Sequence, residues 1–489
     1  MKKESGRPLG CHSVCPVQQH MLIVAMCFFA MLVSHGMRTV FSVSMNEMKL
    51  RNDIENYIDD DGEINCPRPP NNTMNITMES FFDWDATQRL NLGRAFYLSY
   101  LVGHITCGML SDYFGGKQIM GYGVLISAMT TFVTPQMLHQ WGYNGFVASR
   151  VFVGLFQGSI NPSCATLLAH WIPRSKRCRL ATIIFSAGHL GTGIGYSATN
   201  LGLGSGWTGS FYLFGGLGIA WFPFWQLLCF NNPLEDPIIT KQERQSLLSE
   251  IRDADMLNGQ VTHWQEMASN GPVKALVVGF IGYKYYNTLI VQEIPRYMRD
   301  IIRFDMTTSW YWLTSAHILK FVTAFVIAVL SDNLNNNSRL SPRATRKIFA
   351  GIAGFGSSIL LLLLTTAGCH KVYGLICVML GFALTAANYS GVVVNTLDLC
   401  PNFAGVLMAI TNGMGGIISV MVPSMVASIV VDQHLSEWRN VMALSMAVYC
   451  VCTLIFIIFS DSDVQDFNEV EEAPKASTIR RNRYSTETI

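Results

Sequence analysis

The stretch GMLSDYFGGK, residues 108–117, separates two long apolar runs of the chain, which cover about residues 88–111 and 118–138. A helix that crosses the hydrocarbon core of a bilayer needs roughly 20 apolar residues, so each run predicts a membrane-spanning helix. The stretch between them carries one carboxylate, Asp112, and two adjacent glycines. This combination predicts a tight turn at the membrane surface.

Runs of the same kind continue on both sides of this turn. Six precede a polar stretch at residues 231–272 and six follow it. The pattern predicts an all-α membrane protein of twelve transmembrane helices in two six-helix halves, residues 20–230 and 273–460, joined by residues 231–272. The runs cover about residues 20–46, 88–111, 118–138, 143–168, 180–203, 208–230, 273–297, 309–331, 347–369, 372–397, 403–432 and 440–460.

The composition agrees with a membrane protein. Of the 489 residues, 50% are hydrophobic and 14% are charged, and the mean hydropathy is +0.29. A soluble chain of this length needs more charge to cover its surface, and the net charge of +1 argues against a nucleic-acid partner. Most of the 13 cysteines stand in apolar runs, so we expect no metal site. The first apolar run is too long for a cleavable signal peptide.

Lysine and arginine in the short loops predict the orientation of the helices. The loop 173–179 and the loop after the eighth run are rich in basic residues, while the loops 140–144 and 204–209 on the opposite side carry none. Basic loops stay in the cytoplasm, so we expect the N-terminus (1–19), the linker and a disordered tail (461–489) to be cytoplasmic. The first loop, 47–87, then faces the outside or a lumen, where glycosylation is expected at its sequons, Asn71 and Asn75.

The stretch 108–117 resembles the loop signature of the major facilitator superfamily, Gly-x3-Asp-(Arg/Lys)-x-Gly-(Arg/Lys)-(Arg/Lys). Further motifs resemble one branch of that superfamily, the anion–cation symporters, which includes sodium-phosphate cotransporters, sialin and vesicular glutamate transporters. The resemblance runs from about Arg38 to Gln465. The motifs that carry it include FDW at 82–84, RVFVGLFQG at 150–158, WIP at 171–173, GW at 206–207 and NTLDLCP at 395–401.

The resemblance implies a major-facilitator fold with the substrate at the midplane, between two halves that rock to expose it to either side in turn. It also implies that Asp112 forms a latch. In such a latch a carboxylate at one helix end meets the N-terminal dipole of a neighbouring helix, and the contact breaks when the halves rock. Tyr113 and Gly116 stand where the signature has basic residues, which weakens the expected latch. The alternative for Asp112 is an ordinary tight turn.

Arg38 lies deep in the first predicted helix. Inserting an ionisable side chain at this depth costs roughly 2.5–3.5 kcal/mol on insertion scales, so we expect Arg38 to have a structural or functional role. The resemblance implies that Arg38 grips the carboxylate of a substrate, which suits its planar fork of donors. The structural alternative is an ion pair with a carboxylate such as Glu293 or Asp398.

Arg150 and Gln157 stand two helical turns apart and therefore share one helix face. The family usually has glutamate at the position of Gln157, and sialin-like members carry another at the position of Val153. Neither residue titrates here, which argues against proton coupling through this helix. His104 is the natural replacement as a titrating group. The alternative for His104 is a histidine packed against a neighbouring helix.

At membrane depth, basic residues outnumber acidic residues. The chief acidic residue there is Glu293, which is a candidate coupling or gating residue. A cavity with surplus positive charge attracts anions. We expect Arg38 and Arg150 to hold the anion, Lys284 and Lys320 to assist, and Tyr283 and Tyr286 to add hydroxyl or ring contacts. The full set of cations comprises Arg38, Arg94, Arg150, Lys284 and Lys320.

These observations predict a secondary active transporter of a small anion such as phosphate, an acidic sugar, a urate-like anion or an acidic amino acid. Na+ and H+ are the candidate coupling ions, transport driven by the membrane potential is the alternative, and no other cofactor is expected. The transport unit is expected to be a monomer in the plasma membrane or a vesicle membrane. The rival from another class is an anion-binding receptor of transporter fold. An enzyme ranks last, because no nucleophile–base–acid set is evident.

Overall fold

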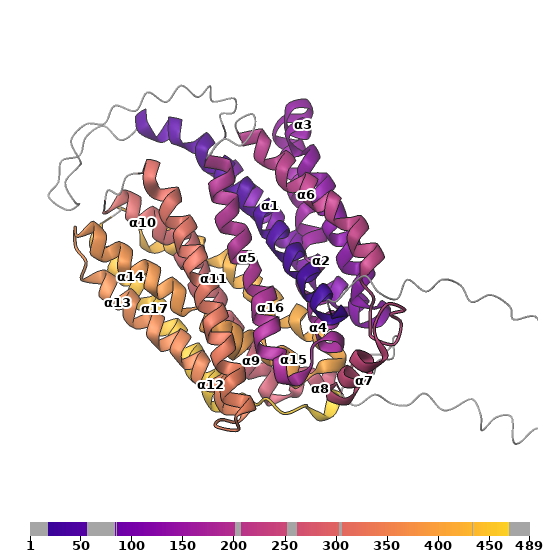
Figure 1. The fold of residues 1–489 in the computed structure, drawn as a ribbon. Coiled ribbons are helices and arrows are strands. Elements are labelled where there is room, and N and C mark those ends of the chain that lie inside the picture. The colour runs from indigo at the N-terminus through magenta and orange to yellow at the C-terminus, as the bar shows by residue number, and fades with distance from the viewer. Residues whose placement is uncertain are drawn as a thin grey trace, which may run out of the picture.

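The computed structural model describes residues 18–55, 84, 86–200, 207–251, 262–302, 306–432 and 434–468. These ranges consist of helices and the turns between them, without strands. The helices group into twelve rods, and the predicted fold class is confirmed. Figure 1 shows the first half (indigo to magenta) beside the second half (orange to yellow).

The first half contains six rods and a short 3-10 turn. One helix, α3, holds two rods, because Gly142, with φ of 55° and ψ of −139°, interrupts it. Glycine populates this left-handed region without steric cost. The second of the two rods continues into α4. The bounds are α1 Gln19–Glu55, α2 Ala86–Phe114, α3 Gly116–Gln157, α4 Ile160–Trp171, η1 Arg174–Lys176, α5 Arg177–Asn200 and α6 Trp207–Leu228.

Two short linker helices, α7 (Lys241–Glu250) and α8 (Trp264–Ser269), precede the second half, where π-helical turns interrupt three of the rods. Such turns are frequent at functional sites. The bounds are α9 Gly271–Thr288, η2 Leu289–Glu293, α10 Ile294–Asp300, α11 Met306–Asn336, α12 Pro342–Gly351, η3 Ile352–Gly356, α13 Ser357–Thr365, α14 Lys371–Leu384, η4 Tyr389–Val393, α15 Asn395–Leu399, η5 Pro401–Phe403, α16 Ala404–Ile429, α17 Leu435–Phe459 and η6 Asp466–Asn468.

Within the described ranges, 8 helical stretches qualify as membrane spans by length and composition, and one of them, Gly116–Trp171, holds two rods. The rods of α2, α5 and α9 are not among them, because glycine, polar and charged residues dilute their apolar content. Large apolar side chains cover the outside of the bundle, as Leu98, Ile359 and Leu454 illustrate with exposed fractions of 60%, 58% and 50%. Such a surface suits contact with lipid.

The predicted luminal loop, 47–87, overlaps helices at both ends. The first helix, α1, continues to Glu55 and α2 begins at Ala86. Apart from Trp84, which is buried, the loop between them lies outside the described residues, as do the predicted glycosylation sites Asn71 and Asn75.

The two halves meet through α5 against α11 (Figure 1). They also meet through α2 against α16. We call the end of the bundle next to α7 the linker end. There, the start of α1 contacts the linker through His20 Nδ1, which lies 2.7 Å from Glu243 Oε1.

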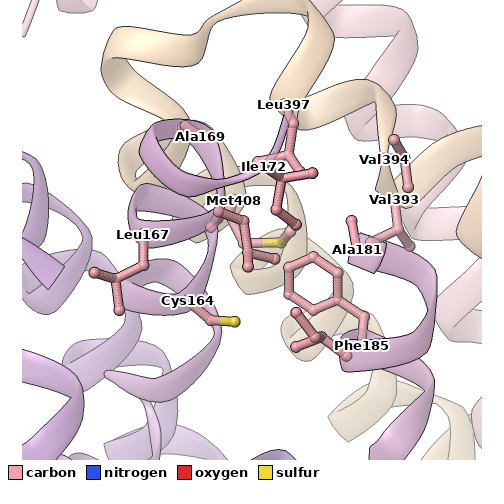
Figure 2. Close-up of a cluster of buried hydrophobic side chains, with 14 of the residues drawn as sticks. Cys164, Leu167, Ala169, Ile172, Ala181, Phe185, Val393, Val394, Leu397 and Met408 are labelled. Carbon is pink, nitrogen blue, oxygen red and sulfur yellow. The ribbon is translucent and has the colours of Figure 1, made fainter. Parts of the chain in front are cut away.

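An apolar seal joins the halves toward the linker end (Figure 2). Its side chains come from α4, the residue after it and α5 in the first half and from η4 through α16 in the second, and all of them are buried. Burying this surface favours the closed arrangement by the hydrophobic effect wherever water would otherwise enter. The seal consists of Cys164, Leu167, Ala169, Ile172, Ala181, Phe185, Val393, Val394, Leu397 and Met408.

A buried ion triad at the same end also crosses between the halves. Asp398, just before the turn that leads into α16, lies 3.2 Å from Arg177 Nη1 on α5 and 2.8 Å from Arg346 Nη2 on α12. Arg346 also donates to the Ser390 carbonyl. One carboxylate thus serves two arginines, one from each half.

We predict that Asp398→Asn strongly destabilises the protein. Arg177 and Arg346 would stay buried without a carboxylate, and breaking a buried pair costs roughly 3–5 kcal/mol. The midpoint of thermal denaturation in detergent micelles should fall accordingly. The matched control is Asp461→Asn, which removes the partner of the half-exposed Arg343 at 3.5 Å and should cost at most about 1 kcal/mol. Equal midpoints for the two variants would contradict the prediction.

Candidate functional site

Four of the predicted cations converge between the two halves. Arg38 (α1) lies within electrostatic reach of Arg150 (α3) and Lys284 (α9), and Lys284 within reach of Lys320 (α11). The fifth predicted cation, Arg94, is exposed on α2. The first half thus supplies two arginines and the second half two lysines.

Arg38 is bound to the first half by an amide and by aromatic rings. Its Nε donates to Gln157 Oε1 at 2.6 Å, and its guanidinium carbon lies 4.6 Å from the centroid of the Tyr100 ring and 5.2 Å from that of Phe96. Gln157 in turn donates to the Ser34 carbonyl. The structural alternative, an ion pair of Arg38 with a carboxylate such as Glu293 or Asp398, is not found among the described residues, and Asp398 binds Arg177 and Arg346 instead.

Arg150 is held between two aromatic rings. Its guanidinium carbon lies 3.5 Å from the centroid of Phe41 and 4.4 Å from that of Phe96. The side chain is 6% exposed, and its buried Nε has no hydrogen-bond partner in the described part of the chain. Aromatic faces attract a cation but accept no strong hydrogen bond, so the donors of Arg150 remain available.

Lys320 is fully buried near the centre of α11. Its Nζ donates to Asn287 Oδ1 at 2.9 Å and lies 4.2 Å from the centroid of Phe382 and 5.5 Å from that of Tyr283. Lys284, which is partly exposed, packs beside Gly415 of α16, and its Nζ lies 5.7 Å from the Tyr283 centroid. Both ammonium groups therefore share the Tyr283 ring.

None of these four cations forms an ion pair with a carboxylate within the described ranges. Their partners are amides and aromatic rings. A buried charge without a counter-charge is costly in a medium of low dielectric constant. The arrangement therefore leaves four cations between the halves without a compensating negative charge among the described residues.

The two predicted tyrosines have different surroundings. Tyr283 lies beside both lysines, and its hydroxyl donates to Tyr389 Oη at 3.4 Å. Tyr286 is 1% exposed, donates to the Ser357 carbonyl and stacks on Tyr449. The position of Tyr286 inside the second half favours a packing role over a contact with a substrate.

Two predicted coupling residues, His104 and Glu293, are also buried. His104 Nδ1 lies 2.7 Å from the Gly158 carbonyl oxygen and Nε2 lies 3.1 Å from Asn412 Nδ2. A neutral ring with the proton on Nδ1 satisfies both contacts, which favours the packed-histidine alternative. Glu293 closes the π-helical turn η2 at the interrupted seventh rod and interacts with neighbouring groups.

Asp112 has the geometry of the predicted latch. It accepts hydrogen bonds from the backbone N–H groups of Gly405 and Val406 at the start of α16, at 3.1 and 2.7 Å, and from Thr166 Oγ1 at 2.6 Å. A Cβ on Gly405 would lie 2.5 Å from Asp112 Oδ1, so only glycine allows this approach. The carboxylate of one half thus caps a helix of the other.

Sequence reasoning missed a second latch of the same kind. Asp332, near the end of α11, accepts from the backbone N–H of Arg179 at the start of α5, at 2.9 Å. The signal was present, because Leu-Ser-Asp at 110–112 recurs at 330–332, once in each half. An internal repeat of the halves explains both copies.

Sequence reasoning also missed three central histidines. His189 on α5 faces His317 on α11, and the ring of His35 on α1 packs against Gly188. All three stand in predicted membrane helices, where an ionisable residue is a functional candidate by default. In the described ranges, no group of three or more His, Cys, Asp or Glu side chains is arranged to hold a metal ion.

The chain is similar to known transporters along most of its length. The family model of the Major Facilitator Superfamily matches residues 27–423. A putative inorganic phosphate cotransporter of Drosophila ananassae is 26% identical over 458 residues, 91% of this chain and 94% of that protein. Sialin of Homo sapiens is 26% identical over 460 residues, 93% of this chain and 91% of sialin.

The likeness extends to a solved structure of the same fold. The proton:xylose symporter XylE, bound to 6-bromo-6-deoxy-D-glucose, has a TM-score of 0.64 at 14% identity, over 90% of this chain and 95% of that one. The predicted resemblance is therefore confirmed, and it is to transporters rather than enzymes. The chain belongs to the major facilitator superfamily, in its branch of anion–cation symporters, and is a multi-pass membrane transporter.

Proposed function

We propose that this protein is a secondary active transporter of a small organic or inorganic anion, which it moves by alternating access. The observation that carries the proposal is the set of four cations between the halves, Arg38, Arg150, Lys284 and Lys320, whose described partners include no carboxylate. The substrate classes are phosphate, acidic sugars, urate-like anions and acidic amino acids.

Two other buried arginines of the same bundle can be compared with these cations. Arg177 and Arg346 share Asp398, so their charge is compensated by the chain itself. Arg150 is as deeply buried but has two ring faces and an unpartnered Nε instead. A carboxylate or phosphate oxygen placed between Arg38 and Arg150 would supply the missing charge and accept paired N–H bonds from a planar guanidinium.

The names of the relatives support an oxyanion. Both an inorganic phosphate cotransporter and sialin align over nearly the whole chain. An oxyanion bound by two arginines and two lysines fits both names, and Phe41, Phe96 and Tyr100, whose rings lie against the two arginines, are the aromatic groups nearest to it for contact with an organic body.

We further propose that the linker end is cytoplasmic and that both termini lie on that side. The exposed Arg174 and Arg339 gather at this end, where Asn336 Nδ2 donates to the Ser175 carbonyl at 2.9 Å. Basic loops favour the cytoplasm. At the other end, in the turn between α13 and α14, Cys369 is disulfide-bonded, as expected in an oxidising compartment. The seal, the triad and the latches then close the cytoplasmic side.

Uptake by the purified protein in proteoliposomes tests the proposal. Labelled phosphate, L-glutamate, N-acetylneuraminate and urate are offered with proton, sodium and potential gradients imposed one at a time. Accumulation of one anion under one gradient supports a transporter and identifies its coupling. Saturable binding without uptake or exchange of any of the four would instead favour the receptor.

We predict that Arg150→Lys lowers anion affinity while the charge is kept. Lysine lacks the planar fork, and the loss of one hydrogen bond to a charged group costs roughly 1.5–3 kcal/mol, or about 10- to 150-fold in affinity. The concentration dependence of exchange measures the change. The control is Arg94→Lys on the exposed face of α2, which should leave the affinity unchanged. An unaltered affinity for the Arg150 variant removes this residue from the site.

We predict that Gln157→Glu introduces a new pH dependence. A carboxylate at this position lies beside Arg38 Nε, now 2.6 Å from Gln157 Oε1, and would neutralise the arginine when ionised. Uptake should therefore be weak at neutral pH and recover as acidification protonates the new carboxyl group. Gln136→Glu, at an exposed position on α3, is the control. If both variants follow the wild-type pH profile, Arg38 does not bind the anion.

A further inference from the structure

One imidazole from each half meets at the contact between α5 and α11. His189 Nδ1 lies 3.1 Å from His317 Nδ1, and the side chains are 9% and 3% exposed. A hydrogen bond between two imidazole nitrogens needs one N–H and one lone pair. The contact therefore holds one proton between the two Nδ1 atoms, and it is lost when both atoms carry a proton.

The groups that face this pair are cationic, aromatic or hydroxylic. Lys320 on α11, Lys284 on α9 and His35 on α1 act electrostatically on His189. Within the described ranges, no carboxylate is among the groups acting on either ring. The remaining neighbours are the rings of Tyr196, Phe382 and Tyr389, and Tyr283, which is hydrogen-bonded to Tyr389.

We propose that His189 and His317 form the proton site that couples proton movement to anion movement, an inference that rests on the proposed anion transport. Imidazole exchanges its proton near neutral pH. A second proton on the pair adds a positive charge beside Lys320, which is unfavourable while the central cations lack a counter-charge. An anion bound among these cations removes that penalty, so it promotes protonation of the pair. By reciprocity, protonation raises the affinity for the anion by the same factor.

Protonation of the pair also acts on the contact between the halves. When the added proton puts an N–H on both Nδ1 atoms, the hydrogen bond between α5 and α11 is lost, because the N–H of an imidazolium ring then faces the N–H of a neutral ring. Only N–H bonds form and break, and the proton comes from water and returns to it. A monoanion and a proton bound together add no net charge, so the loaded protein is the form in which this contact is weakened.

His104 is less suited to this role. The Gly158 carbonyl and the Asn412 amide engage both of its ring nitrogens, and the side chain is fully buried. A proton added at Nε2 would face an amide N–H. At the pair of His189 and His317, a proton added at Nδ1 disrupts only the hydrogen bond between the two rings themselves.

The test compares wild-type protein with His189→Asn and His317→Asn in proteoliposomes. Asparagine places a hydrogen-bonding group near the position of Nδ1 but carries no titrating proton. Phosphate, L-glutamate, N-acetylneuraminate and urate are the labelled probes, and every variant is compared at the same pH values, so that changes in the charge of the probe cancel. The control is His139→Asn, at an exposed position on α3.

With one proton per anion, each pH unit of gradient supports roughly tenfold accumulation. We expect wild type and His139→Asn to show this accumulation. The two pair variants should lose it while still exchanging labelled for unlabelled anion, a process that needs no net proton movement. Exchange thus reports folding and anion binding separately from coupling.

Two results overturn the inference and leave the proposed function intact. One is gradient-driven accumulation by both pair variants equal to that of wild type. The other is exchange by wild type without any response to a pH gradient. Absence of exchange of all four anions by wild type would instead overturn the proposed anion transport, and the inference with it.

Discussion

Arginine and lysine side chains inside a bilayer cost free energy unless a counter-charge reaches them, and this requirement organises the whole bundle. At the linker end the chain meets the requirement itself, with Asp398 placed between Arg177 and Arg346. Between the halves it does not, because Arg150 and Lys320 have aromatic rings and an amide as partners. The first arrangement joins the two halves by an ion triad, and the second leaves the central cations without a compensating charge among the described residues.

The aromatic rings around the central cations have a physical purpose. The electron-rich face of Phe41 or Tyr100 attracts a guanidinium without occupying its donors. The arginine is thereby held in one orientation, as a bidentate contact requires, and the cost of ordering it is met before the ligand arrives. The apolar seal (Figure 2) buries side chains of both halves against each other, and charge interactions are stronger in surroundings of low polarity.

Much of the fold was predictable from the sequence, because each membrane helix needs its own apolar run. The two runs predicted at residues 118–138 and 143–168 are two rods in the structure, because Gly142 breaks α3 between them. The π-helical turns η2 and η4 were not predicted, because they depend on packing between rods rather than on local composition.

The sequence could indicate which residue types are candidates for the site, but not in which direction each side chain points from its helix. Their charge at membrane depth made Arg38, Arg150 and Lys320 candidates, and the structure brings these three residues to the region between the halves. The sequence could not tell that Tyr286 reaches Ser357 inside its own half while Tyr283 lies beside the lysines, because a small rotation of the helix decides between them. The pairing of His189 with His317 depends on contact between distant helices, which one sequence does not reveal.

The two latches have a consequence for how the molecule switches. Asp112 of the first half caps α16 of the second, and Asp332 of the second half caps α5 of the first. Each half thus holds a helix end of the other. A rigid-body rotation that opens the linker end separates both contacts in the same movement, so an intermediate with one latch open requires a half to deform. The free-energy barrier to opening then includes the loss of both contacts at once. Switching is therefore expected to be an all-or-none event rather than a gradual widening of the linker end.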